Sequence, residues 1–73
     1  MIKAGTILEW EETIQYYVAR TGAMAIARYD ESEDGMVDVM WLPHTKDLST
    51  TQHDGEYYSD NFRIVTTAAV RTN

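Results

Sequence analysis

The chain lacks the residues from which many small proteins build covalent or metal cross-links. None of its 73 residues is a cysteine, which excludes disulfides and every cysteine-based zinc or iron–sulfur site. It has one proline and four scattered glycines, too few for a proline-rich linker or a glycine-rich phosphate loop. A chain of this length forms one domain at most, so we expect residues 1–73 to form a single domain with an efficient core.

Long apolar runs and an excess of basic residues are also missing. No stretch approaches the roughly eighteen apolar residues of a membrane span, and residues 1–5 lack the features of a signal peptide. We therefore expect a soluble cytoplasmic protein without membrane contact. Twelve acidic residues stand against six basic ones, giving a net charge of -6. This charge argues against direct nucleic-acid binding and favours a protein partner with a basic surface.

The spacing of apolar residues predicts short strands in the first half. Residues 6–10 form a first strand, with Leu8 and Trp10 on one face. Residues 13–19 are rich in β-branched and aromatic side chains and favour a second strand, with a helix over residues 9–19 as the alternative. After a turn at Gly22, residues 23–29 read as a strand with alternating large side chains and alanines.

The second half contains the clearest strand and a closing segment. Residues 36–42 alternate apolar and polar side chains, with valines and a tryptophan on one face, and Pro43 ends the strand. Residues 44–54 form a loop and are followed by a short strand at Tyr57 and Tyr58. Ser59 is placed to cap one turn of 3-10 helix.

After that turn, the chain returns to apolar residues. Phe62 is placed to fill the core, and residues 63–65 form the last strand. Phe62, Ile64 and one ring of Tyr57 or Tyr58 are expected to close the structure. Five strands at this spacing, joined by turns, predict an all-β fold, a small five-stranded antiparallel barrel.

The order of these segments resembles the SH3-like small β-barrels. The resemblance rests on residues 3–8, 22–29, 37–42 and 58–65. It covers residues 3–65 and leaves 66–73 as a tail or an extension of the last strand. It implies a barrel with a short 3-10 turn before the last strand, and the chain is similar in size and style to small bacteriophage proteins of this kind. The fold alone does not imply a ligand.

The chain departs from the best-known ligand-binding members of that family. Residues 7–11 lack the tyrosine-bearing motif of signalling SH3 domains, and the nucleic-acid-binding members tend to be basic. Neither ligand class is therefore expected here.

Tyrosines are the main candidates for a protein contact. In each adjacent pair on a strand, one ring faces the core and its neighbour faces solvent. Exposed aromatic rings are frequent in protein interfaces, although they also simply cover strand faces. The candidate protein-binding residues are Tyr16, Tyr17, Tyr29, Tyr57 and Tyr58.

Acidic residues form the second candidate set, a rim that would steer a basic partner. The rim comprises Glu11, Glu12, Asp30, Glu31, Glu33 and Asp34. Together the two sets predict a non-enzymatic interaction module, phage-encoded, acting as a virion or assembly component or as an accessory protein that binds a host factor. A homo-oligomer is compatible with this function. The alternative is an acidic mimic of nucleic acid that would use Glu9 with the rim residues.

Catalytic, metal and cofactor sites are not predicted. Asp30, Ser32 and Asp34 match the first half of a calcium loop, but Trp41 occupies the place of its last ligand. His44 and His53 share one loop, yet their irregular spacing gives no fixed ligand geometry for zinc. No serine or histidine stands beside a partner suited to nucleophilic catalysis.

Overall fold

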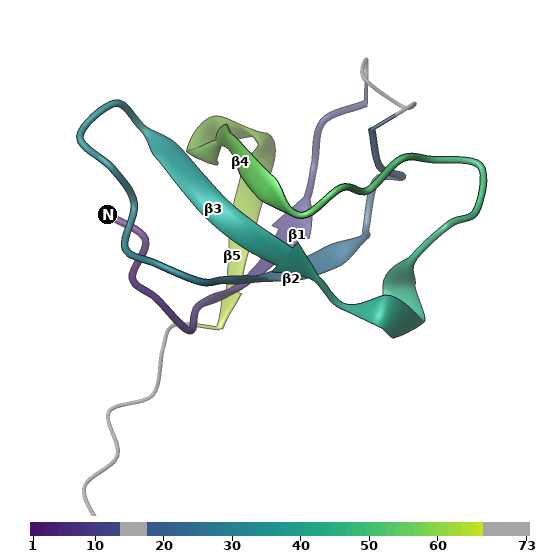
Figure 1. Cartoon of the computed structure of the whole chain (residues 1–73), viewed down its shortest axis with the longest axis horizontal. Coiled ribbons are helices and arrows are strands. Elements are labelled where there is room, and N and C mark those ends of the chain that lie inside the picture. Colours follow the sequence, from purple (N-terminus) through teal and green to yellow (C-terminus); the bar gives the residue numbers. More distant parts are fainter. Residues whose placement is uncertain (14–17, 67–73) are drawn as a thin grey trace, which may run out of the picture.

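The fold is a single antiparallel sheet with two short 3-10 helices. The computed structural model describes residues 1–13 and 18–66. The strands are β1 (Ile7–Trp10), β2 (Met24–Ala27), β3 (Met36–Trp41), β4 (Gly55–Tyr58) and β5 (Phe62–Thr66), and the 3-10 helices are η1 (Pro43–Thr45) and η2 (Ser59–Asn61). The predicted all-β class, the five antiparallel strands and the 3-10 turn before the last strand are confirmed (Figure 1). No helix in these described ranges has the length and apolar character needed to cross a bilayer.

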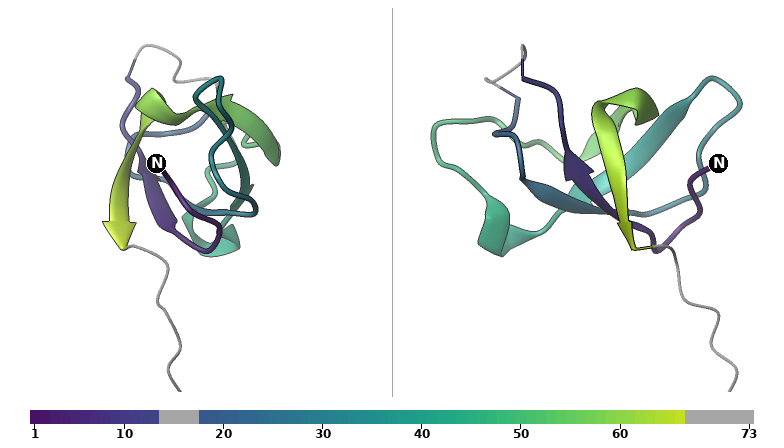
Figure 2. Two further views of the ribbon diagram at one scale, coloured as in Figure 1. Left: turned by 90° about the vertical axis from the view of Figure 1, so that its left-hand side faces the viewer. Right: turned by 180° about the vertical axis from the view of Figure 1, so that it is seen from behind.

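The sheet is curled but not closed. Its strand order is β4-β3-β2-β1-β5, so that within the described chain β4 pairs only with β3, and β5 only with β1. The three-residue η2 carries the chain from β4 to the opposite end of the sheet, and the two outer strands lie on opposite sides of the molecule (Figure 2). The expected barrel is therefore joined by side chains, not by a continuous hydrogen-bond ladder.

The core follows from the alternation of side chains along the strands. Leu8 and Trp10 of β1 are fully buried, as predicted. The two alanines of β2 are also buried, and the register places Ala25 between Leu8 and Trp41. A small side chain at this position leaves room for the large residues on the neighbouring strands. The inward residues of β3, Val37 among them, complete this buried layer.

Four aromatic rings close the open side of the sheet. Trp10, Trp41, Tyr57 and Phe62 contact one another at centroid separations from 5.2 to 6.3 Å, mostly edge to face. This geometry is favourable for aromatic pairs. Tyr57 lies on β4 and Phe62 on β5, so their contact joins the two outer strands. The prediction that Phe62 fills the core is confirmed.

Two detailed expectations about the strands are wrong. Thr13, Val18 and Ala19 are not in a strand, and the rest of the predicted strand over 13–19 lies outside the described residues. Ala19 and Val18 instead pack on the core from a loop, which explains their apolar character. Ile64 was expected in the core but is 47% exposed. Ile64 lies on the outer strand β5, where it pairs with Leu8 of β1. Since the sheet is open, no further strand of the described residues covers it.

The long connection between β3 and β4 has more structure than the sequence indicated. Pro43 starts η1, consistent with the preference of proline for the first helical position. Gln52 is buried, with a φ of 36°, and its side-chain oxygen accepts hydrogen bonds from the Asp47 amide (2.7 Å) and the Thr50 hydroxyl (3.0 Å). The backbone amide of Gln52 donates to the carbonyl of Val18 at 2.8 Å. One polar residue thus connects this loop to the β1–β2 connection.

Candidate functional site

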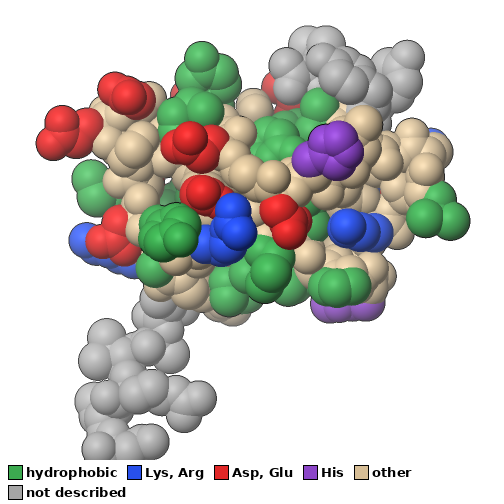
Figure 3. All heavy atoms as spheres, in the orientation of Figure 1, with side chains coloured by type: hydrophobic (Ala, Val, Ile, Leu, Met, Phe, Trp, Pro, Cys, Tyr) green, Lys and Arg blue, Asp and Glu red, His purple; other side chains and the backbone are tan. Residues whose placement is uncertain are grey.

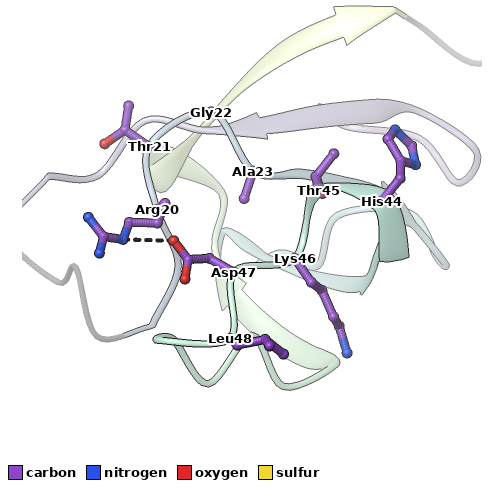
Figure 4. Close-up of a pocket in the computed structure, with 9 residues that line it drawn as sticks. All are labelled: Arg20, Thr21, Gly22, Ala23, His44, Thr45, Lys46, Asp47 and Leu48. Carbon is purple, nitrogen blue, oxygen red and sulfur yellow. Dashed lines mark ion pairs between the residues drawn. The ribbon is translucent and has the colours of Figure 1, made fainter.

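An open hollow lies between the end of the β1–β2 connection and the segment that follows η1. Its volume is about 700 Å³, and Figure 4 shows the nine residues that line it. Arg20 and Asp47, which both line the hollow, form an ion pair, with Arg20 Nε 3.0 Å from a carboxylate oxygen of Asp47. His44 and Lys46 point away from this pair. The charged groups therefore do not converge on a common point where a substrate could be held.

The hydroxyls in the hollow are engaged in structural hydrogen bonds. Thr21 donates to the Glu12 carbonyl at 3.3 Å, and Thr45 donates to the Leu42 carbonyl at 2.8 Å. Neither hydroxyl has a carboxylate or imidazole as its hydrogen-bond partner, which an activated nucleophile requires. The hollow thus offers a binding recess without a nucleophile–base pair among its lining residues.

The candidate metal ligands are not gathered into a site. Within residues 1–13 and 18–66, no group of three or more histidine or acidic side chains is placed to hold a metal ion. In the partial calcium loop, the Asp30 carboxylate accepts the Ala4 amide at 2.9 Å and pairs with Lys3 at 3.5 Å. The Ser32 hydroxyl accepts the Met36 amide at 3.2 Å. Asp30 therefore holds the N-terminal segment, and Ser32 stabilises the β2–β3 hairpin.

The tyrosines divide between core and surface. Tyr57 points inward, and its hydroxyl donates to the His53 carbonyl. Tyr58 points outward and is 65% exposed, whereas Tyr57 is half-buried against the core. In this pair, one ring therefore faces the core and its neighbour faces solvent, as expected. Tyr29 is similarly exposed at 64%. Tyr16 and Tyr17 lie outside the described residues.

Two residues of the acidic rim fasten the N-terminal segment to the β2–β3 connection. Glu31 accepts the Ile2 amide at 2.9 Å and the Ser59 hydroxyl at 2.8 Å. Asp30 holds Ala4 as described above. Ile2 is thereby held in the core cluster. We call these two carboxylates the N-terminal latch. Their hydrogen bonds hold the fold together, so they are not freely available to a partner.

The latch hydrogen bonds favour the charged forms of both carboxylates. The Ala4 amide, assisted by the charge of Lys3, lowers the pKa of Asp30 below its ordinary value. The Ile2 amide and then the Ser59 hydroxyl lower the pKa of Glu31 in the same way. Both groups therefore remain ionised in moderately acidic solution.

The other rim residues are spread over the surface. Glu33 and Asp34 are exposed at the tip of the β2–β3 hairpin. Glu11 lies near Arg63, at 3.9 Å, on the β1–β5 side of the sheet. Glu12 also interacts with another group of the chain. The six predicted rim residues therefore do not form one continuous acidic surface.

A mixed surface covers the solvent side of β2, β3 and β4, and we call it the outer face. Strand pairing places Tyr58 beside Met36, and Glu56 beside Asp38. Further along β3, Met40 lies beside Ile26 of β2. The outer face consists of Ile26, Arg28, Met36, Asp38, Met40, Glu56 and Tyr58. Figure 3 shows acidic and basic side chains close together on the molecule, with hydrophobic side chains around them.

The centre of the outer face is ordered by an ion pair. Arg28 Nε donates to Asp38 at 2.8 Å, and the Arg28 amide donates to the Asp38 carbonyl at the same distance. The hydrogen bond to the Asp38 carboxylate raises the pKa of Arg28. Glu56 lies beside Asp38 on the other side, without a basic partner in the described chain. The outer face thus has a fixed charged centre with one extra negative charge.

Comparison with protein-family models, curated proteins and solved structures finds no match for the chain. The candidate site is therefore defined by the geometry of the chain alone.

Of the outer face, only Tyr58 was among the residues expected from the sequence to contact a partner. The other residues, among them Met36, Met40 and Arg28, belong to the same strands that build the core. Strict alternation along β3 was the available signal, since every residue between two core residues faces solvent. Methionine is enriched in protein interfaces, so outward methionines next to an exposed tyrosine are consistent with a contact surface.

Proposed function

We propose that the protein is a non-enzymatic protein–protein interaction module that contacts its partner through the outer face. The observation that supports this most directly is the 65% exposure of Tyr58, beside Met36 on a rigid strand pair. Met40 adds a second exposed apolar side chain, 45% exposed, on the same face. Tyrosine contributes a large contact area at a modest cost in conformational entropy, and both tyrosine and methionine are frequent in interfaces.

The charge of the molecule favours a basic partner. The net charge is -6, and Glu56 lies beside the Arg28–Asp38 ion pair with no basic partner among residues 1–13 and 18–66. Complementary charge accelerates encounter and selects against acidic partners. Within this proposal, we carry over the resemblance to small phage proteins inferred from the sequence, and we expect the partner to be a virion or assembly protein of a bacteriophage or a protein of its host.

Photo-crosslinking tests the proposed contact. A photoreactive phenylalanine analogue at Tyr58 should crosslink a defined partner in native lysate, whereas the same analogue at Leu48 should not. Leu48 is the matched control because it is fully exposed but lies on the hollow and not on the outer face. The proposal would be contradicted if both positions crosslink the same proteins equally, or if the protein stays monomeric and the analogue at Tyr58 forms no specific adduct.

The alternative, an acidic mimic of nucleic acid, is less well supported by the arrangement of the carboxylates. Asp30 and Glu31 are engaged by backbone amides, and Glu11 lies on another part of the surface. A mimic requires an array of free carboxylates on one face. Capture of a nuclease or repressor that about 0.5 M salt releases would favour this alternative, because charge-driven contacts are screened under those conditions.

A further inference from the structure

We propose that the free edge of β4 binds an extended basic segment of the partner protein, which adds to the sheet as a sixth strand. The inference rests on the proposed interaction function and names the chemistry of the partner. The feature that carries it is the end of the strand order, where β4 has a neighbour on only one side within the described residues.

The backbone of β4 presents hydrogen-bonding groups on its open side. The Ser59 amide donates to the Gly35 carbonyl at 2.9 Å, and the register continues from this pair to Val37↔Tyr57 and Val39↔Gly55. In an antiparallel ladder, alternate residues bond to the same neighbour. The amides and carbonyls of Glu56 and Tyr58 therefore point away from β3.

The bonds of β3 confirm this assignment independently. The Asp38 carbonyl accepts the Arg28 amide, and the amide of Leu42, just after β3, donates to the Met24 carbonyl, so the backbone groups of these residues face β2. The residues that alternate with them, Val37 and Val39, consequently face β4. The open edge therefore offers the N–H groups of Glu56 and Tyr58 and the C=O of Glu56, groups to which an added strand binds. The Tyr58 carbonyl is already engaged, because Tyr58 is the N-cap residue of η2.

The edge of β5 is a poorer docking site than that of β4. Its register with β1 shifts between Ile7 and Leu8, and such irregularities twist an edge and interrupt pairing. Arg63 on β5 carries a positive charge and is held by Glu9, with Nε at 2.6 Å from the carboxylate. β4 has neither a register shift nor a basic residue, and no proline interrupts it. β4 thus lacks these three protections of an edge, although it is short and carries the charged Glu56.

The charge around β4 identifies the kind of segment that fits. Residues 53–60 include three exposed carboxylates and no lysine or arginine. The side chains of Glu56 and Tyr58 share the outer face, so a lysine or arginine of the added strand would lie beside a carboxylate and an aromatic ring. Residues of the added strand that face the other way would lie beside Tyr57 and favour apolar side chains. A segment of alternating basic and apolar residues satisfies both faces.

A second copy of the chain is a less suitable occupant. Antiparallel pairing of β4 with itself would bring the acidic residues of the two copies together around Glu56, and like charges on neighbouring strands are destabilising. Each copy also carries a net charge of -6. Charge complementarity therefore selects a basic segment over self-association.

Nuclear magnetic resonance with defined peptides tests the proposal. A capped peptide of alternating valine and lysine should shift the backbone resonances of β4 and slow hydrogen exchange at the Glu56 and Tyr58 amides. The matched peptide with glutamate in place of lysine should leave both unchanged. Peptide binding that leaves these two amides in fast exchange would overturn the proposal, as would the absence of binding.

Two variants at Glu56 separate the contributions of the backbone and of the charge to peptide binding. Glu56→Lys keeps the amide and reverses the charge, and it should weaken binding of the valine–lysine peptide about tenfold or more. Glu56→Pro removes an amide that the β3–β4 ladder does not use, and it should abolish the protection at Tyr58. The spectrum of the core residues shows whether each variant is folded. If both folded variants bind the peptide like the wild type, the edge is not the site.

The same variants distinguish this inference from the broader function. A lysate partner that crosslinks to Tyr58 equally well in the wild type and in folded Glu56→Pro would leave the interaction function standing and refute strand addition. A dimer at high protein concentration with slow exchange at Glu56 and Tyr58 would show that a second copy occupies the edge, and would also refute the basic segment.

Discussion

Neighbouring tyrosines on β4 have opposite environments. Tyr57 packs against both tryptophans and Phe62, whereas Tyr58 is exposed on the outer face. The period of two along a strand is sufficient to explain the difference. The same substitution should therefore lower the stability of the fold at Tyr57 and weaken partner binding at Tyr58.

Alanine substitution of the two tyrosines provides this comparison. Tyr57→Ala should lower the free energy of unfolding by about 2–4 kcal/mol, because it removes a ring from the aromatic cluster. Tyr58→Ala should change it by less than about 0.5 kcal/mol and weaken partner binding instead. Urea denaturation measures the first effect, and recovery of the crosslinked partner measures the second. A large loss of stability in Tyr58→Ala would assign that ring to the core.

The two tryptophans differ in their polar groups. Trp41 Nε1 donates to the His53 carbonyl at 3.0 Å. Trp10 Nε1 is buried, and the described part of the chain gives it no hydrogen-bond partner. An unpaired buried donor is itself unfavourable, so it offsets part of the stability that burial of the Trp10 ring provides.

Phenylalanine substitutions should reveal this difference. Trp10→Phe and Trp41→Phe remove similar volumes from the same cluster, but only Trp41→Phe also removes a hydrogen bond. We expect Trp41→Phe to be more destabilising by about 1 kcal/mol. Paired urea titrations of the two variants test this, and an equal loss would mean that Trp10 has a partner of its own.

At the level of elements, the N-terminal latch links acid stability to Glu31 and Asp30. A carboxylate with a lowered pKa in the folded state stabilises the fold above its ordinary pKa, and this stabilisation is lost as the pH falls through the folded value. The ordinary values are 3.8 for aspartate and 4.5 for glutamate. The loss should therefore begin as the pH drops below this range.

Titration of stability with pH tests the latch. The free energy of unfolding of the wild type should fall as the pH decreases from about 5 to about 3, and Glu31→Gln should show a shallower fall. Glu33→Gln removes the same charge from the exposed hairpin tip and is the matched control. If both variants follow the same curve, the Glu31 hydrogen bonds do not contribute to stability.

The strand elements could be predicted from the sequence because their core residues alternate regularly. Val37 and Trp41 in β3, and Leu8 in β1, lie where their spacing predicted. The connections could not be predicted in the same way. Gln52 is buried because its side chain bonds to residues of its own loop, and Val18 packs on the core from outside a strand. Such contacts depend on tertiary structure and leave no periodic pattern.

Much less of the candidate site was accessible from the sequence. Adjacent tyrosines implied that one of them is exposed, but not which one, and the choice depends on the register between β3 and β4. The exposure of Ile64 depends on the openness of the sheet, which apolar spacing does not report. The acidic rim was inferred from composition, whereas two of its members have backbone amides as partners.

At the level of the whole molecule, the open sheet predicts alternating protection along a single strand. In the free protein, the Gly55 and Tyr57 amides should exchange slowly, because they face β3. The Glu56 and Tyr58 amides should exchange almost as fast as in an unfolded chain, because they face solvent. Amide hydrogen exchange resolved by residue measures this pattern. Uniform protection along β4 would show that another part of the chain covers the edge.

The aromatic cluster also gives the molecule a spectroscopic signature. Its only two tryptophans, Trp10 and Trp41, lie with ring centroids 5.8 Å apart, at an interplanar angle of 64°. Indoles held this closely and at an angle couple their electronic transitions, which produces a paired band of opposite signs in circular dichroism. This band depends on the contact between β1 and β3 side chains and disappears when the contact opens. The protein thus carries an internal optical reporter of its own tertiary structure, without any added label.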